Sequence, residues 1–158
     1  MSWLRHTRSA EQTQRAGEEF ASLLRAGDVV LLSGILGAGK TTFTQGVARG
    51  LGVSDRVTSP TFTMVRQHEC SNDVGITTLH HADIYRAGSL SEVDDLALGE
   101  LVEESAVALV EWGDAAASLF GRDVISVAFA IDDFDARTLE VDGALEDRAV
   151  EIESWSRS

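Results

Sequence analysis

Residues 34–41 combine glycine, lysine and a hydroxyl at a spacing suited to binding phosphate. The segment is Gly-Ile-Leu-Gly-Ala-Gly-Lys-Thr and fits the pattern G-x-x-x-x-G-K-[ST]. In such a loop the glycines let backbone N–H groups approach phosphate oxygens closely. The lysine reaches the β- and γ-phosphates, and the next hydroxyl is a ligand for Mg²⁺. Lys40 is the only lysine of the chain, so it is the one candidate for that role.

The segments on both sides of this loop support the interpretation. Residues 28–33 are mostly apolar and predict a buried parallel strand, and residues 42–52 predict a helix that ends at glycine. A helix that starts at the loop directs the positive end of its dipole toward the bound anion. The alternative is a glycine-rich turn that only joins a strand to a helix, and the flanking segments argue against it.

A second candidate group is the carboxylate of Glu111, which ends the apolar run 106–110. In phosphate-loop proteins an acid at the end of a buried strand organises Mg²⁺ beside the loop. The alternative is an edge glutamate in a salt bridge. Trp112 follows directly, and it either packs on the nucleotide or belongs to the core.

Two further segments contain polar groups that could belong to the same site. Residues 58–61 are rich in hydroxyls and include the only proline, so they are either a switch that senses γ-phosphate or an ordinary Ser/Thr turn. Asp83 follows a predicted strand, at the end where ligands bind in open α/β sheets. His80 and His81 alternate faces, so at most one of them can point to a site. Their spacing fits no usual zinc site.

The remaining pattern predicts an α/β fold. We expect a three-layer sandwich of the P-loop NTPase type, with a mixed, mostly parallel central sheet and an antiparallel edge. Residues 1–142 are predicted to form a single domain. Residues 143–158 are predicted to be an acidic C-terminal tail that is helical or disordered. Residues 3–8 are either a frayed end or a cover over the nucleotide base.

The predicted elements follow from periodicity and capping signals. They are a helix over 10–25 after the cap Ser9, a hairpin of strands 61–67 and 75–81, two short helices ending near 104, a short helix over 113–120, and an antiparallel edge pair 124–131 and 137–141.

Composition limits the classes of function. The chain has 158 residues and a net charge of −13, and it contains no apolar run of the ~20 residues that a membrane helix needs. Residues 61–158 contain six basic and twenty-one acidic residues. We expect so acidic a surface to repel nucleic acid, so in a nucleic-acid pathway a partner protein would hold the nucleic acid. Solubility alone is the alternative explanation of this acidity. Cys70 is the only cysteine, so no internal disulfide is expected and a cytoplasmic location is the simplest setting.

Four segments in series resemble the TsaE family, the YjeE-type bacterial P-loop ATPases of tRNA threonylcarbamoyladenosine biosynthesis. They are G-x-L-G-A-G-K-T-T-F at 34–43, S-P-T-F at 59–62, H-x-D-x-Y-R at 81–86 and E-W at 111–112. The resemblance covers about residues 10–142. The first segment is generic to phosphate-loop proteins, whereas the other three in this order make the resemblance specific.

The resemblance implies a cytoplasmic, Mg²⁺-dependent ATPase that hydrolyses ATP to ADP slowly on its own. It implies that the protein acts as a switch subunit with the partner proteins TsaB and TsaD, and that it meets tRNA only through them. The implied catalytic residues are Lys40, Asp83 and Glu111, and the implied Mg²⁺ ligands are Thr41 and Glu111. The implied nucleotide-binding residues are Glu11, Gly37, Ala38, Gly39, Lys40, Thr41, Thr42, Thr61 and Trp112. Whether Asp83 or Glu111 orients the attacking water stays open.

The sequence departs from the family pattern at two points. Ile35 replaces a residue that is often polar or acidic, and residues 113–116 lack a glutamate–arginine pair found in some members. Three other functions are alternatives. A GTPase would need a guanine-binding motif, which the sequence lacks. A small-molecule kinase would need an arginine-rich lid, and the sequence has no such segment. An adaptor would bind ATP with negligible turnover.

Overall fold

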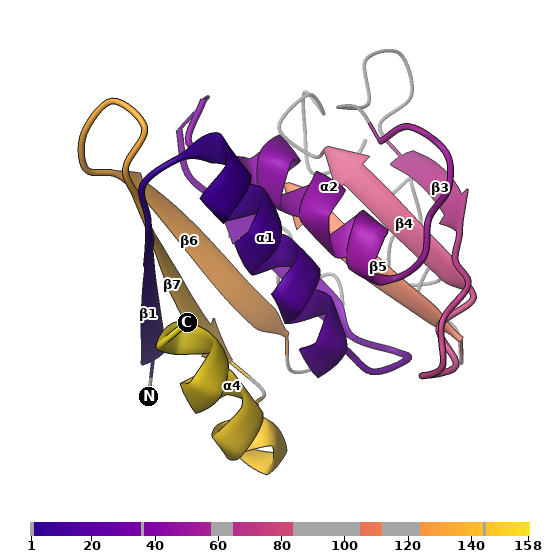
Figure 1. Cartoon of the computed structure of the whole chain (residues 1–158). Coiled ribbons are helices and arrows are strands. Elements are labelled where there is room, and N and C mark those ends of the chain that lie inside the picture. The colour runs from indigo at the N-terminus through magenta and orange to yellow at the C-terminus, as the bar shows by residue number, and fades with distance from the viewer. Residues whose placement is uncertain (1, 36, 58–64, 84–104, 112–123, 144) are drawn as a thin grey trace, which may run out of the picture.

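The described residues of the computed structural model, 2–35, 37–57, 65–83, 105–111, 124–143 and 145–158, form a mixed seven-stranded sheet with helices (Figure 1). The strand order is β1-β7-β6-β2-β5-β4-β3. The strands are β1 Ser2–Thr7, β2 Val29–Ser33, β3 Val65–Glu69, β4 Thr78–Asp83, β5 Ala106–Glu111, β6 Ile125–Ile131 and β7 Arg137–Gly143. The α-helices are α1 Ala10–Phe20, α2 Lys40–Gly50 and α4 Ala149–Ser156.

The four central strands β6, β2, β5 and β4 run parallel, and the outer pairings are antiparallel. All six residues of β5 and the first four of β2 are buried, because strands in the middle of a parallel sheet are covered on both faces. The predicted α/β fold with a mixed sheet is therefore confirmed. The sheet has antiparallel pairing at both of its margins, whereas one antiparallel edge was predicted.

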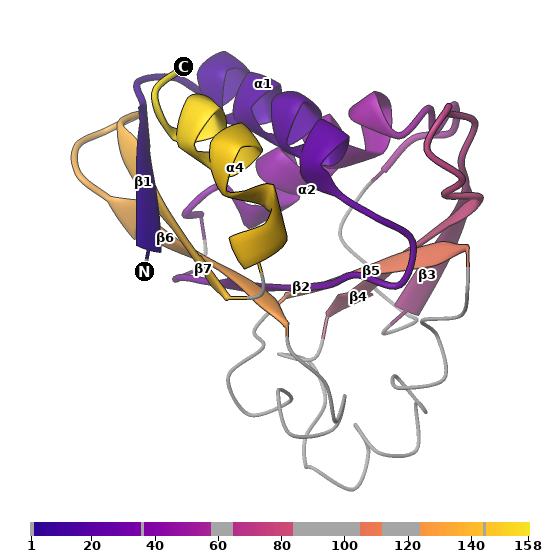
Figure 2. The ribbon, with the colours of Figure 1, turned by 90° about the horizontal axis from the view of Figure 1, so that it is seen from below.

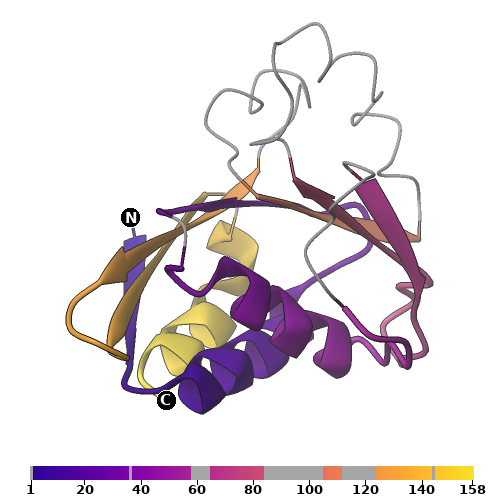
Figure 3. The same ribbon diagram turned by 90° about the horizontal axis from the view of Figure 1, so that it is seen from above.

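Figures 2 and 3 show that α1, α2 and α4 lie on the same face of the sheet. The helices predicted between 84 and 104 and over 113–120 lie outside the described residues. None of the helices in the described ranges is long and apolar enough to cross a membrane.

Helix α1 begins as predicted and ends earlier. The Ser9 hydroxyl caps it by accepting a hydrogen bond from the Gln12 amide at 3.1 Å. A 3₁₀ turn over Ala21–Leu23 follows, and Leu24 is already extended with φ −77° and ψ 146°. The chain must reverse within a few residues to enter β2, so the helix cannot continue to residue 25.

Residues 2–7 are not a frayed end, so this prediction for the N-terminal segment is wrong, whereas a cover over the nucleotide base stays a prediction. They form β1, which pairs with β7 at the margin of the sheet. Arg5 is buried on this strand, donates to Glu19 at 2.7 Å and lies 5.2 Å from the centre of the Trp155 ring. The buried positions of this strand alternate with exposed ones, but a charged residue, Arg5, occupies one of the buried positions and hides the alternating pattern in the sequence.

Both predicted hairpins are present with different bounds. Strand β3 starts at Val65 and ends at Glu69, two residues beyond the predicted end, and residues 61–64 lie outside the described residues. Strand β6 is not at the margin of the sheet, because it pairs in parallel with β2. Strand β7 is not at the margin either, because β1 pairs with its outer side.

The C-terminal residues are helical, which was one of the two predicted alternatives. A 3₁₀ turn over Glu146–Arg148 leads into α4, whose Trp155 is buried and donates from Nε1 to the Ala16 carbonyl at 2.9 Å. Arg148 makes two hydrogen bonds of 2.6 and 3.0 Å to Asp28, the residue before β2. These contacts tie α4 to α1 and to the start of the central strand.

Helices α1 and α2 touch through glycines. A Cβ atom on Gly46 would lie 1.9 Å from the Gln14 carbonyl oxygen, and one on Gly17 would lie 2.2 Å from the Phe43 carbonyl oxygen. The two backbones therefore approach more closely than any side chain would allow. The contact places α2, and the loop before it, against α1.

The Gly46→Ala variant should lose about 2 kcal/mol or more of unfolding free energy, because the new methyl group forces the two helices apart. Urea denaturation followed by circular dichroism measures the change. The control is Arg15→Ala on the exposed side of α1, which should change stability by less than about 0.5 kcal/mol. Equal stability of Gly46→Ala and wild type would contradict the close contact.

Trp155→Ala should cost about 3–5 kcal/mol, because it removes a buried ring and leaves a cavity beside α1. The matched control on the same helix is Val150→Ala, since Val150 is 81% exposed. Thermal and urea denaturation of both variants test the prediction. If the two variants proved equally stable, α4 would not be part of the core.

Candidate functional site

The predicted strand–loop–helix unit is present. Strand β2 ends at Ser33, and α2 begins at Lys40 with Gly39 as its N-cap. Gly37 and Gly39 have φ angles of +84° and +106°, a region that other residues rarely adopt. The loop backbone can therefore direct amide groups toward an anion at the N-terminus of α2.

The side chain of Lys40 is folded back across this loop. Its Nζ donates a hydrogen bond to the Gly34 carbonyl oxygen at 2.6 Å. The lysine thus spans the loop from its last residue to its first. The only lysine of the chain therefore lies across the loop that the motif identifies, and its contact with phosphate stays a prediction.

Thr41 and Glu111 meet beside the loop. The Thr41 hydroxyl donates to Glu111 Oε1 at 3.3 Å. The pairing of β2 with β5 places Leu32 opposite Glu111, and the pairing of β4 with β5 places Asp83 opposite Glu111. The ends of three neighbouring parallel strands therefore place the loop and both predicted acids at one edge of the sheet. Asp83 is 7% exposed and Glu111 is 4% exposed.

Glu111 is a carboxylate in a buried setting. Burial raises its pKa, but His81, Lys40 and the Thr41 hydroxyl together outweigh it, and the net pKa lies below the ordinary value of 4.5. Nε2 of His81 is 3.5 Å from Glu111 Oε2, which is at the outer limit of hydrogen-bond distance. The group is therefore negative at neutral pH.

These groups fit Mg²⁺ better than zinc. An ionised carboxylate and a hydroxyl are hard oxygen ligands, and Mg²⁺ is usually held by one or two carboxylates together with substrate phosphates. Within the described ranges, no group of three or more His, Cys, Asp and Glu side chains could hold a metal ion.

Other predicted residues occupy different places. Ala38 is fully buried in the loop, and Thr42 lies in the first turn of α2. Glu11 is exposed in the first turn of α1. Trp112 and the whole segment 58–61, which includes Thr61, lie outside the described residues.

Sequence reasoning missed three residues near the loop. From α1, the Thr13 methyl carbon would lie 3.3 Å from a Cβ on Gly39, and the Thr13 hydroxyl is 2.7 Å from that of Thr7. Arg137 on β7 donates to the Gly37 carbonyl at 3.3 Å and to the carbonyls of the β6–β7 turn. Neither contact has a sequence signal, because each depends on how separate elements pack. His81 had a partial signal, since strand alternation puts it on the same face as Asp83.

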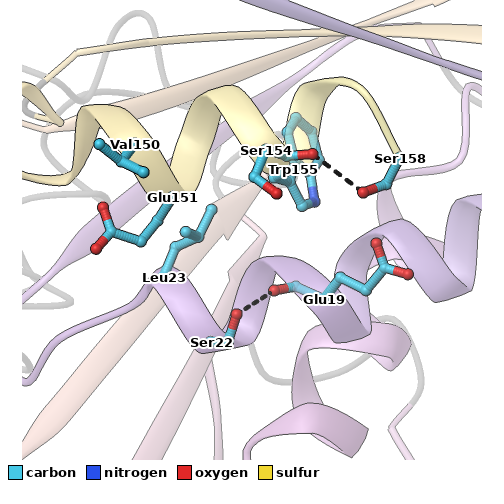
Figure 4. Close-up of a pocket in the computed structure, with 8 residues that line it drawn as sticks. All are labelled: Glu19, Ser22, Leu23, Val150, Glu151, Ser154, Trp155 and Ser158. Carbon is cyan, nitrogen blue, oxygen red and sulfur yellow. Dashed lines mark hydrogen bonds between the residues drawn. The ribbon is translucent and has the colours of Figure 1, made fainter.

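A groove of about 410 Å³ lies between the end of α1 and α4 (Figure 4). Within it, the hydroxyls of Ser22 and Ser158 donate to the carbonyls of Glu19 and Ser154. The residues that line this groove include neither Asp83 nor Glu111, and none of them belongs to the phosphate loop. It is therefore separate from the candidate site.

Known proteins match this chain over most of its length. The model of the family "Threonylcarbamoyl adenosine biosynthesis protein TsaE" matches residues 7–139. The tRNA threonylcarbamoyladenosine biosynthesis protein TsaE of Treponema pallidum is 38% identical over 125 residues, which are 79% of this chain and 89% of that protein. The protein of the same name from Streptomyces coelicolor is 50% identical over 99 residues, 62% of this chain and 65% of the relative.

A solved structure agrees with these matches. The crystal structure of YdiB from Bacillus subtilis superposes with a TM-score of 0.74 at 30% identity, and the match covers 99% of this chain and 95% of the other. The family model and the curated relatives point to the same family as the motif series. The chain belongs to the TsaE family, whose members are proteins of threonylcarbamoyladenosine biosynthesis.

Proposed function

We propose that this protein is a Mg²⁺-dependent ATPase, and that it acts as a switch subunit with TsaB and TsaD in the threonylcarbamoyladenosine modification of tRNA. The observation that carries the proposal is the contact between Thr41 and Glu111 next to Lys40. These three groups are what ATP hydrolysis with Mg²⁺ requires: a lysine for phosphate, and a hydroxyl and a carboxylate for the metal.

Each group has a distinct task in this proposal. Lys40 leaves the Gly34 carbonyl and neutralises the β- and γ-phosphates, while the amides of residues 37–41 bind phosphate oxygens. Thr41 and Glu111 hold Mg²⁺, which when bound supplies further neutralisation of the phosphate charge. Asp83, at the same sheet edge, is available to orient the attacking water.

The partners of the proposal follow from the family and from the charge of the chain. Residues 61–158 are strongly acidic and disfavour direct binding of tRNA. A subunit of this kind would act on proteins that hold the tRNA. ATP hydrolysis by the purified protein, alone and with TsaB, TsaD and tRNA, tests this. Slow turnover that the partners raise supports the switch, and formation of a phosphorylated small molecule together with ADP would favour a kinase instead.

Lys40→Ala should lower the ATPase rate by at least about 100-fold, because it removes the ammonium that neutralises the γ-phosphate. The control is Arg49→Ala at the far end of α2, where the side chain is 70% exposed. The control should keep the wild-type rate. An unchanged rate in Lys40→Ala would exclude this loop as the site of hydrolysis.

Glu111→Gln should raise the Mg²⁺ concentration needed for half-maximal hydrolysis by about tenfold or more, because an amide is a weaker ligand than a carboxylate. Binding of ATP in the presence of a chelator should change less than about twofold. Rates across a Mg²⁺ titration and calorimetric binding measure the two effects. Equal loss of binding with and without metal would make Glu111 a structural residue.

A further inference from the structure

His81 is fully buried on β4, two residues before Asp83. It lies on β4 opposite Leu109 of β5, it is 0% exposed, and it shares a face of the strand with Asp83. Its Nε2 atom faces Glu111 Oε2 at 3.5 Å. The imidazole therefore lies on the side of Glu111 that Thr41 does not occupy.

The burial of this ring is not explained by packing alone. Within the described part of the chain, neither of its nitrogens has a hydrogen-bond partner. Burial of a polar group without such a bond costs free energy, so a leucine would suit a purely apolar position better. The polar atom that is aimed at it, the Glu111 carboxylate, is the natural partner.

The two oxygens of Glu111 have different neighbours. Oε1 accepts the hydrogen bond from Thr41, and Oε2 is the oxygen next to His81. A bond from His81 to Oε2 would fix the rotation of the carboxylate and keep Oε1 directed toward Thr41. Metal-binding carboxylates are commonly held by such outer partners, and loss of a partner costs about 10–100-fold in metal affinity.

We propose that His81 is the positioning residue of Glu111: its Nε2–H donates to Oε2 and holds the carboxylate in the orientation that binds Mg²⁺. The proposal rests on the function proposed above, because it assumes that Glu111 is a metal ligand. The neutral ring with its proton on Nε2 is sufficient as the donor, so the role needs no change of charge.

The test compares two variants of His81 with a matched core variant. His81→Leu keeps the apolar volume and removes the donor, whereas His81→Gln keeps an N–H donor of similar reach. Leu79→Val lies two residues earlier on β4, is also 0% exposed, and destabilises the core without removing a polar group. Calorimetry measures ATP binding with excess Mg²⁺ and with chelator, and thermal denaturation measures stability.

His81→Leu should reduce the gain in ATP affinity that Mg²⁺ provides by about tenfold or more, with affinity in chelator unchanged within about twofold. His81→Gln should restore most of this gain in affinity. Leu79→Val should lower the melting temperature and leave the gain in affinity unchanged. If His81→Leu keeps the full gain, or if Leu79→Val loses it equally, the positioning role is wrong. A wild-type protein whose ATP affinity does not respond to Mg²⁺ would overturn the proposed function, and this role with it.

A measurement on the unmodified protein keeps the proposal testable if His81→Leu does not fold. The ¹⁵N chemical shifts of the His81 ring in the nucleotide-free protein report which nitrogen bears the proton. A protonated Nε2 is expected, and its signal should shift in Glu111→Gln. A ring with its proton only on Nδ1 has no donor toward Glu111 and would contradict the proposal.

Discussion

The parallel pairing of β5 with β2 on one side and β4 on the other is the constraint on which the candidate site depends. The register that places Glu111 opposite Leu32 and Asp83 is what brings the acids beside the loop. A shift of one residue would turn Glu111 to the other face of the sheet, away from Thr41. The hydrogen-bond ladder of three neighbouring strands therefore positions the acids, and the loop supplies its backbone amides together with Lys40 and Thr41.

The helical side of the sheet keeps this edge in place. Helix α2 is set against α1 by the contacts of Gly46 and Gly17, and α1 is in turn fixed by Trp155 of α4. At the other end of β2, Arg148 pairs with Asp28. The central strand is thus anchored at its start by the C-terminal part of the chain and at its end by the helix that follows the loop. Elements far apart in sequence thus converge on one strand and hold the edge of the sheet where the candidate site lies.

Local patterns predicted the parts of this structure that are local. The motif at residues 34–41, the apolar run before Glu111 and the Ser9 cap each identify an element from neighbouring residues, and the structure confirms these elements. The misses are non-local. Strand β1 was hidden because Arg5 is buried through contacts with residues 19 and 155, and the contact of Arg137 with the loop joins residues 100 positions apart. Such pairings are set by packing, which periodicity does not encode. The roles of the individual site residues stay predictions.

The two margins of the sheet bear on how the protein behaves at high concentration. A strand at a margin presents unpaired amides and carbonyls to which another chain can add, and charges at such positions hinder that addition. Among the described strands, β1 is marginal and has the inward guanidinium of Arg5, while β3 exposes Arg66 and Glu69. A second copy that paired with β3 would have to desolvate Arg66 and Glu69, whereas Arg5 on β1 is already buried against Glu19. The exposed charges of β3 therefore hinder addition of a further strand at that margin.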